Sequence, residues 1–139
     1  MPKPLKPENA THLVVHCTAT RCDHEFTVDS LIDTGIERFG QPSYHYYVRC
    51  DGEIVPILSK SLQGIHAVGF NRSSIAICYE GGLDIHGKAA DTRTPKQKAS
   101  LYQLLKDLRK DYPKDHIVGH RELPRTHKDC PCFIASKEY

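Results

Sequence analysis

The sequence predicts a single α/β domain in which helices flank a central mixed β-sheet. Short apolar runs typical of buried strands alternate along the chain with longer segments whose apolar residues recur at helical spacing. The 139 residues are the length of one ordinary domain and can bury a core of their own. Because no repeat or linker divides the chain, we expect one domain over 1–139, with an extended lead-in at 1–11 and a core at 12–133.

The first strand and the first helix are predicted near the N-terminus. Residues 12–17 (HLVVHC) form a short apolar run that suits a buried strand. A helix is predicted at about 27–39, where five apolar residues share one helical face: Val28, Leu31, Ile32, Ile36 and Phe39. Gly35 lies on the same face, where a missing side chain would permit close packing, and Gly40 is a suitable terminator.

A β-hairpin and a central strand follow. Residues 44–50 (YHYYVRC) and 53–57 (EIVPI) flank the Asp-Gly pair at 51–52, which is a strong hairpin signal between two β-rich runs. Pro56 limits the second strand of this hairpin to an edge of the sheet or to its own end. Residues 74–80 (SIAICYE) are apolar enough for a central strand.

The second helix has the clearest boundaries in the sequence. Thr94 and Pro95 are a good N-cap and first-turn pair, and Pro113 ends the helix. Its apolar residues recur at helical spacing: Leu101, Leu104, Leu105, Leu108 and Tyr112. A last short strand is predicted at 116–120, and we expect 121–139 to be irregular.

The composition excludes several classes of protein. The formal net charge is only +2 and basic residues are interspersed with acidic ones, so we expect no nucleic-acid partner. No apolar run approaches the roughly 18 residues that a membrane helix needs, so we expect no membrane partner. The first ten residues, MPKPLKPENA, have no apolar stretch of signal-peptide length, so we expect cytoplasmic synthesis. The six cysteines are then expected to be reduced, although Cys17 and Cys22 are near enough in sequence to form a bridge.

Nine histidines and six cysteines offer metal ligands, but their spacing alone is a weak signal. A catalytic zinc site usually has three protein ligands and keeps a fourth position for water. A structural zinc site normally shows closely spaced Cys pairs at two places, and this chain does not show such pairs at two places. The nearest local group consists of His127, Cys130 and Cys132, which lacks a good fourth ligand.

Five sequence blocks, in order, give a more specific signal. They are VVHCTAT at 14–20, SYHYYVRCDG at 43–52, GIHAVGFNRSSIAICYEGG at 64–82, GHRE at 119–122 and KDCPCF at 128–133. Together they resemble the type 2 N-acetylmuramoyl-L-alanine amidases. That family includes the small amidases of phages and the peptidoglycan recognition proteins. The resemblance implies their fold, a mixed sheet flanked by helices.

The resemblance also implies a catalytic zinc site. His16, His120 and Cys130 are similar to the family's three zinc ligands. Tyr44 is similar to the active-site tyrosine, which hydrogen-bonds the metal-bound water or the substrate carbonyl. Lys128 is similar to the lysine with which the phage enzymes stabilise the developing oxyanion.

The implied function is hydrolysis of the amide bond between N-acetylmuramic acid and L-alanine in peptidoglycan. His66 and Asn71 fall in the block whose residues line the family's substrate groove. We expect a monomer with Zn²⁺ as cofactor that acts on the cell wall after release, as an endolysin of a phage or prophage does. The main alternative is a recognition module that binds muropeptide without cutting it. Such modules typically lose the cysteine ligand, so Cys130 favours the enzyme. Regulation of another protein, known for some phage amidases, is a further alternative.

Overall fold

A five-stranded mixed sheet forms the centre of the computed structural model, which describes residues 2–126 and 128–139. The strand order is β4-β3-β5-β1-β7. The bounds are His12–Cys17 for β1, Tyr46–Val48 for β3, Ile54–Pro56 for β4, Ser74–Tyr79 for β5 and His116–Gly119 for β7. All neighbouring strands are parallel except β3 and β4, which form the antiparallel hairpin. The predicted mixed sheet is therefore confirmed, and Pro56 lies on an edge strand.

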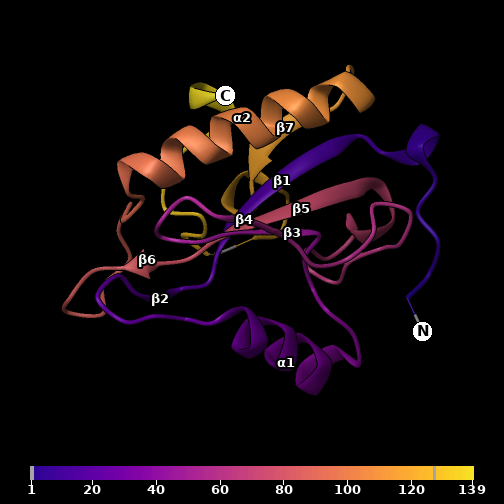
Figure 1. Ribbon diagram of the computed structural model, residues 1–139. Coiled ribbons are helices and arrows are strands. Elements are labelled where there is room, and N and C mark those ends of the chain that lie inside the picture. The colour runs from indigo at the N-terminus through magenta and orange to yellow at the C-terminus, as the bar shows by residue number, and fades with distance from the viewer. Residues whose placement is uncertain (1, 127) are drawn as a thin grey trace.

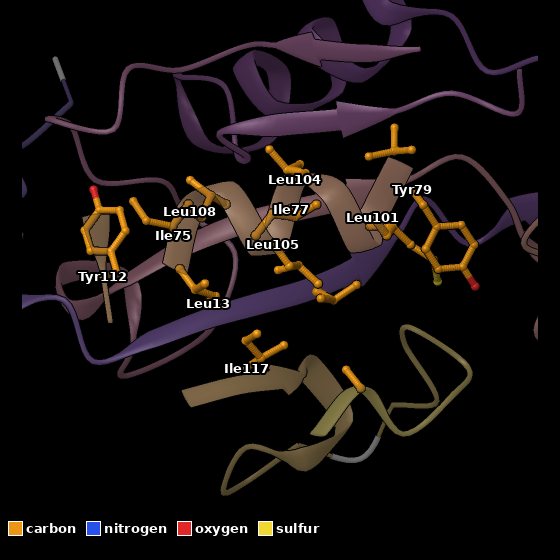
Figure 2. Close-up of a cluster of buried hydrophobic side chains, with 14 of the residues drawn as sticks. Leu13, Ile75, Ile77, Tyr79, Leu101, Leu104, Leu105, Leu108, Tyr112 and Ile117 are labelled. Carbon is orange, nitrogen blue, oxygen red and sulfur yellow. The ribbon is translucent and has the colours of Figure 1, made fainter. Parts of the chain in front are cut away.

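Two helices cover opposite faces of this sheet (Figure 1). Helix α2 (Pro95–Asp111) lies on one face, and α1 (Val28–Phe39) lies on the other. Because side chains alternate along a strand, neighbouring residues of β1 point to different faces. Leu13 belongs to the apolar cluster beneath α2, which Figure 2 shows, whereas Val14 belongs to a separate cluster. His16 points to the same face as Val14, opposite α2.

The predicted boundaries of both helices are confirmed. The Thr94 side chain accepts a hydrogen bond from the Gln97 backbone N–H, and the Gln97 side chain accepts one from the Thr94 backbone N–H. This reciprocal pair is a capping box. Thr27 caps α1 through one hydrogen bond, which its side chain accepts from the Ser30 N–H, and Gly40 ends that helix with a left-handed φ of 78°.

The buried face of α1 is narrower than the sequence predicts. Leu31 and Gly35 are buried, and a Cβ on Gly35 would lie 2.9 Å from the Gln41 carbonyl oxygen, so the predicted close packing is confirmed. Ile36 and Phe39, by contrast, are 49% and 46% exposed. Ile36 lies roughly 140° around the helix from Leu31 at about 100° per residue, so it falls beside the buried stripe. Phe39 lies at the end of α1, in its last turn.

Short elements that the sequence does not predict lie outside the main sheet. A two-residue parallel pair joins β2 (Thr20–Arg21) to β6 (Gly82–Leu83). Among the described residues there are also three 3-10 helices that the sequence pattern does not predict: η1 (Pro7–Asn9), η2 (Asn71–Ser73) and η3 (His120–Glu122).

The two ends of the chain are more ordered than predicted. The segment 121–139 contains α3 (Ala135–Glu138), so it is not wholly irregular. The core includes Leu5 and Ala135, which lie outside the predicted range. A tertiary contact explains α3: the guanidinium of Arg93, almost fully buried, contacts Glu138 at 2.6 Å. The local sequence around α3 cannot predict this contact, because Arg93 lies 45 residues before Glu138.

No helix among the described residues is both long and apolar enough to cross a bilayer. None of the six cysteines forms a disulfide in the structure, and Cys17 is not bridged to Cys22.

Candidate active site

Three side chains from distant parts of the chain meet at one point above the sheet. His16 lies near the end of β1, His120 follows β7 directly, and Cys130 lies in the loop before α3. Their ligand atoms all lie within 4.8 Å of one another. The parallel pairing of β1 with β7 places Val15 opposite Gly119. The residues that follow these two, His16 and His120, therefore lie side by side. The two rings are 4.7 Å apart between centroids.

This donor set fits a zinc ion. Zinc bonds of about 2.0–2.1 Å to nitrogen and 2.3 Å to sulfur place tetrahedral ligand atoms roughly 3.3–3.6 Å apart. His16 Nδ1 lies 3.9 Å from Cys130 Sγ, close to such an edge. Burial, followed by the charges of His66, His120 and Lys128, holds the pKa of His16 well below its ordinary value. His16 is therefore neutral, which is the form of imidazole that binds a metal.

Backbone contacts position Cys130. Its Sγ accepts a hydrogen bond from the Cys17 N–H at 3.2 Å, and its carbonyl oxygen accepts one from the Arg121 N–H at 2.7 Å. A Cβ on Gly119 would lie 2.6 Å from Pro131 Cδ, so only glycine permits this close approach of the loop to β7. Cys130 is thus held between the ends of β1 and β7.

Tyr44 and Lys128 lie near the group formed by His16, His120 and Cys130. The Tyr44 ring lies 5.1 Å from the His16 ring between centroids. Burial raises the pKa of Tyr44 well above its ordinary value, so the phenol stays protonated and can donate a hydrogen bond. Lys128 is exposed, and it lies near enough for its charge to lower the pKa of both His16 and His120.

His66 lies in the loop before η2, and Asn71 begins η2, which leads directly into β5. His66 Nδ1 lies 2.8 Å from His16 Nε2, so the structure brings His66 into contact with His16. Burial lowers the pKa of His66 to about 3, which keeps its imidazole neutral. The Asn71 side chain instead accepts hydrogen bonds from the backbone N–H groups of His66 and Ala67, at 2.9 and 3.0 Å. The Asn71 side-chain oxygen therefore stabilises the loop.

A protein-family model described as N-acetylmuramoyl-L-alanine amidase matches residues 6–133 of this chain. The chain belongs to the type 2 N-acetylmuramoyl-L-alanine amidase family. The endolysin of Enterobacteria phage K11 is 30% identical over 129 residues, which cover 92% of this chain and 84% of that protein.

Solved structures agree with this family and its fold. The N-acetylmuramoyl-L-alanine amidase LysC from Clostridium intestinale URNW is 27% identical, with a TM-score of 0.74 over 94% of this chain and 82% of that chain. Bumblebee PGRP-SA is 15% identical, with a TM-score of 0.76 over 99% of this chain and 84% of that chain. At 15% identity, the likeness to bumblebee PGRP-SA confirms only the predicted fold.

The sequence of this amidase-family chain does not predict two polar residues that support the site, Ser74 and Glu122. Ser74 is fully buried at the start of β5, and its Oγ lies 3.0 Å from His66 Nε2. Glu122 accepts a hydrogen bond from the Gly119 N–H at 2.6 Å, at the end of β7. The one feature of the sequence that could have indicated Ser74 is that it is a polar residue at the start of an otherwise apolar strand.

This arrangement gives little support to a structural zinc site built on His127, Cys130 and Cys132. Cys130 groups with His16 and His120, whereas Cys132 Sγ donates to the Gly82 carbonyl oxygen at 3.3 Å. The third residue of that alternative, His127, lies outside the described residues.

Proposed function

We propose that this protein is a zinc-dependent amidase that hydrolyses the bond between N-acetylmuramic acid and L-alanine in peptidoglycan. The convergence of His16, His120 and Cys130 on one point carries the proposal. Two imidazoles and one thiolate suit zinc and leave a fourth position for water. His120 is only partly buried, which suits a site that a large substrate must reach. Family membership and the endolysin relative support the same bond as the target.

Zinc, when bound, would supply Lewis acidity and lower the pKa of the attacking water. The chain's own residues would supply the rest of the catalytic groups. The protonated phenol of Tyr44 would donate a hydrogen bond to the scissile carbonyl oxygen. The ammonium of Lys128 would stabilise negative charge as it develops on that oxygen. The departing amine of L-alanine would take up the proton that the attacking water loses as the bond breaks.

The proposed partner is peptidoglycan or a muropeptide, bound by a monomer that acts on the cell wall after release. The loop with His66 and Asn71 borders the ligand group and would form one wall of the substrate groove. A recognition module would need the groove but no complete set of ligands. The presence of Cys130 beside both histidines therefore favours hydrolysis over binding alone.

Release of muropeptides from purified sacculi tests the proposal. The protein as isolated should carry about one zinc ion per chain and release peptides that begin with L-alanine. Removal of the metal with a chelator should abolish release, and added zinc should restore it. Full activity of metal-free protein would refute the zinc mechanism. Binding to sacculi with no release would instead identify a recognition module.

A further inference from the structure

Both ring nitrogens of His66 are already engaged within the protein. Nδ1 lies 2.8 Å from His16 Nε2, and Nε2 lies 3.0 Å from Ser74 Oγ. The Ser74 hydroxyl in turn donates to the Phe70 carbonyl oxygen at 2.6 Å. Neither nitrogen of His66 is therefore free to bind substrate, although the side chain lies beside a proposed metal ligand.

The direction of each hydrogen bond follows from this chain of contacts. Ser74 has one hydroxyl hydrogen and donates it to Phe70, so its oxygen accepts from His66 Nε2–H. A neutral imidazole carries one N–H, so His66 Nδ1 must be an acceptor. It therefore accepts from His16 Nε2–H. This leaves the lone pair of His16 on Nδ1, the nitrogen that lies 3.9 Å from Cys130 Sγ.

We infer that His66 and Ser74 are positioning residues that hold His16 in the one tautomer able to bind zinc through Nδ1. The inference rests on the proposed zinc site. It assigns the loop before β5 a role in supporting the metal ligand. Asn71 takes part indirectly, because its side-chain oxygen holds the His66 and Ala67 N–H groups and so fixes the loop that carries His66.

The physical gain comes from orientation and from ligand basicity. A metal-binding histidine commonly donates its second N–H to an acceptor, which fixes the ring and strengthens the metal bond. Loss of such an acceptor typically weakens metal affinity by about 10- to 100-fold. Here the acceptor is another imidazole, and a serine and a backbone carbonyl oxygen set its own tautomer in turn.

Zinc affinity, measured by competition with a chromophoric chelator, tests the inference without any substrate. His66→Leu removes the acceptor and should weaken zinc binding by roughly 10- to 100-fold. His66→Asn places an amide oxygen where Nδ1 stood and should recover most of the lost affinity. Ser74→Ala should weaken zinc binding measurably. The matched control is Ser73→Ala, because Ser73 also donates to the Phe70 carbonyl but does not contact His66. It should bind zinc as the wild type does.

The tautomers themselves can be read by ¹⁵N NMR of the histidine rings in the zinc-loaded wild type. Nε2–H on both His16 and His66 is the expected result, and Nδ1–H on His66 would overturn the inference. Equal zinc affinity of His66→Leu and the wild type, or of His66→Leu and His66→Asn, would also overturn it. If the NMR and affinity results hold but sacculi release no peptide, the proposed function fails and the positioning role stands. If the wild type releases peptide while His66→Leu keeps wild-type zinc affinity, the proposed function stands and the positioning role fails.

Discussion

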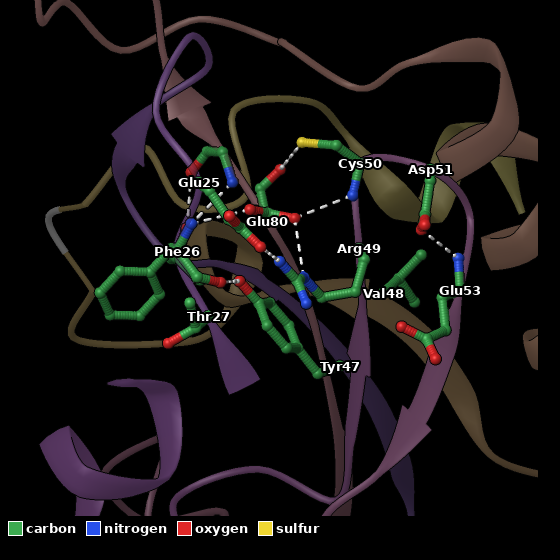
Figure 3. Close-up of polar contacts among 12 residues, drawn as sticks. Glu25, Phe26, Thr27, Tyr47, Val48, Arg49, Cys50, Asp51, Glu53 and Glu80 are labelled. Atoms are coloured by element: carbon green, nitrogen blue, oxygen red, sulfur yellow. Dashed lines mark hydrogen bonds and ion pairs between the residues drawn. The ribbon is translucent and has the colours of Figure 1, made fainter. Parts of the chain in front are cut away.

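Glu80 joins three separate segments of the chain at the end of β5, as Figure 3 shows. Its carboxylate accepts from the backbone N–H of Phe26 at 2.8 Å and of Cys50 at 2.9 Å, and from Arg49 Nε at 3.0 Å. The residue is only 3% exposed. Phe26 lies just before the N-cap of α1, so Glu80 anchors the start of that helix to the sheet.

Glu80→Gln should therefore be strongly destabilising even though the two side chains have nearly the same shape. One carboxylate oxygen becomes an amide NH₂, which must then face a backbone N–H or the guanidinium of Arg49. An unsatisfied buried donor costs about 1–3 kcal/mol, and a lost hydrogen bond to a charged group costs about 1.5–3 kcal/mol. We expect a loss of about 3–5 kcal/mol in the free energy of unfolding, the range typical of a broken buried ion pair.

Urea denaturation followed by circular dichroism measures this loss, and Glu25→Gln is the matched control. Glu25 pairs with the same arginine at 2.9 Å, but its side chain is 70% exposed. An exposed pair contributes at most about 1 kcal/mol, so the control should lose little. Equal losses in the two variants, or a loss below about 1 kcal/mol for Glu80→Gln, would refute the reasoning from burial.

The pH dependence of the same variant provides a second check. Burial alone would raise the pKa of Glu80, but the hydrogen bonds from Arg49, Phe26 and Cys50 outweigh it, and the pKa is lowered. A carboxyl group with a lowered folded-state pKa stabilises the protein fully above its unfolded pKa and loses that contribution as the pH falls through the folded value. The stability difference between wild type and Glu80→Gln should therefore shrink as the pH falls below about 4.3.

Four further variants test the site and the fold. Lys128→Ala should lower kcat by roughly 10²-fold or more with zinc still bound, as expected for one lost transition-state donor; a change in KM alone would mean that it only holds substrate. Cys130→Ser should abolish peptide release and most zinc binding, whereas Cys132→Ser should leave both nearly intact; the opposite pattern would refute the ligand assignment. Thr94→Ala should lower the free energy of unfolding by about 1 kcal/mol in thermal or urea denaturation, and no change would mean that the cap contributes nothing.

Local sequence signals determined the regular elements of this protein. Thr94 and Pro95 start α2 because a side-chain oxygen and a fixed φ satisfy the first turn without any distant partner. The Asp-Gly pair at 51–52 forms its hairpin for a similarly local reason: glycine readily adopts the φ of 89° found at Gly52. The resemblance of five ordered blocks pointed to His16, His120 and Cys130, which the structure brings together.

Tertiary structure alone decided the contacts between residues far apart in the sequence. Helix α3 depends on the buried guanidinium of Arg93, and the exposure of Ile36 depends on which stripe of α1 meets the rest of the chain. The hydrogen bonds of His66 depend on His16, which lies 50 residues earlier. A sequence pattern shows which groups can donate or accept. The direction of each hydrogen bond is determined only when folding places one donor against one acceptor and excludes water from both.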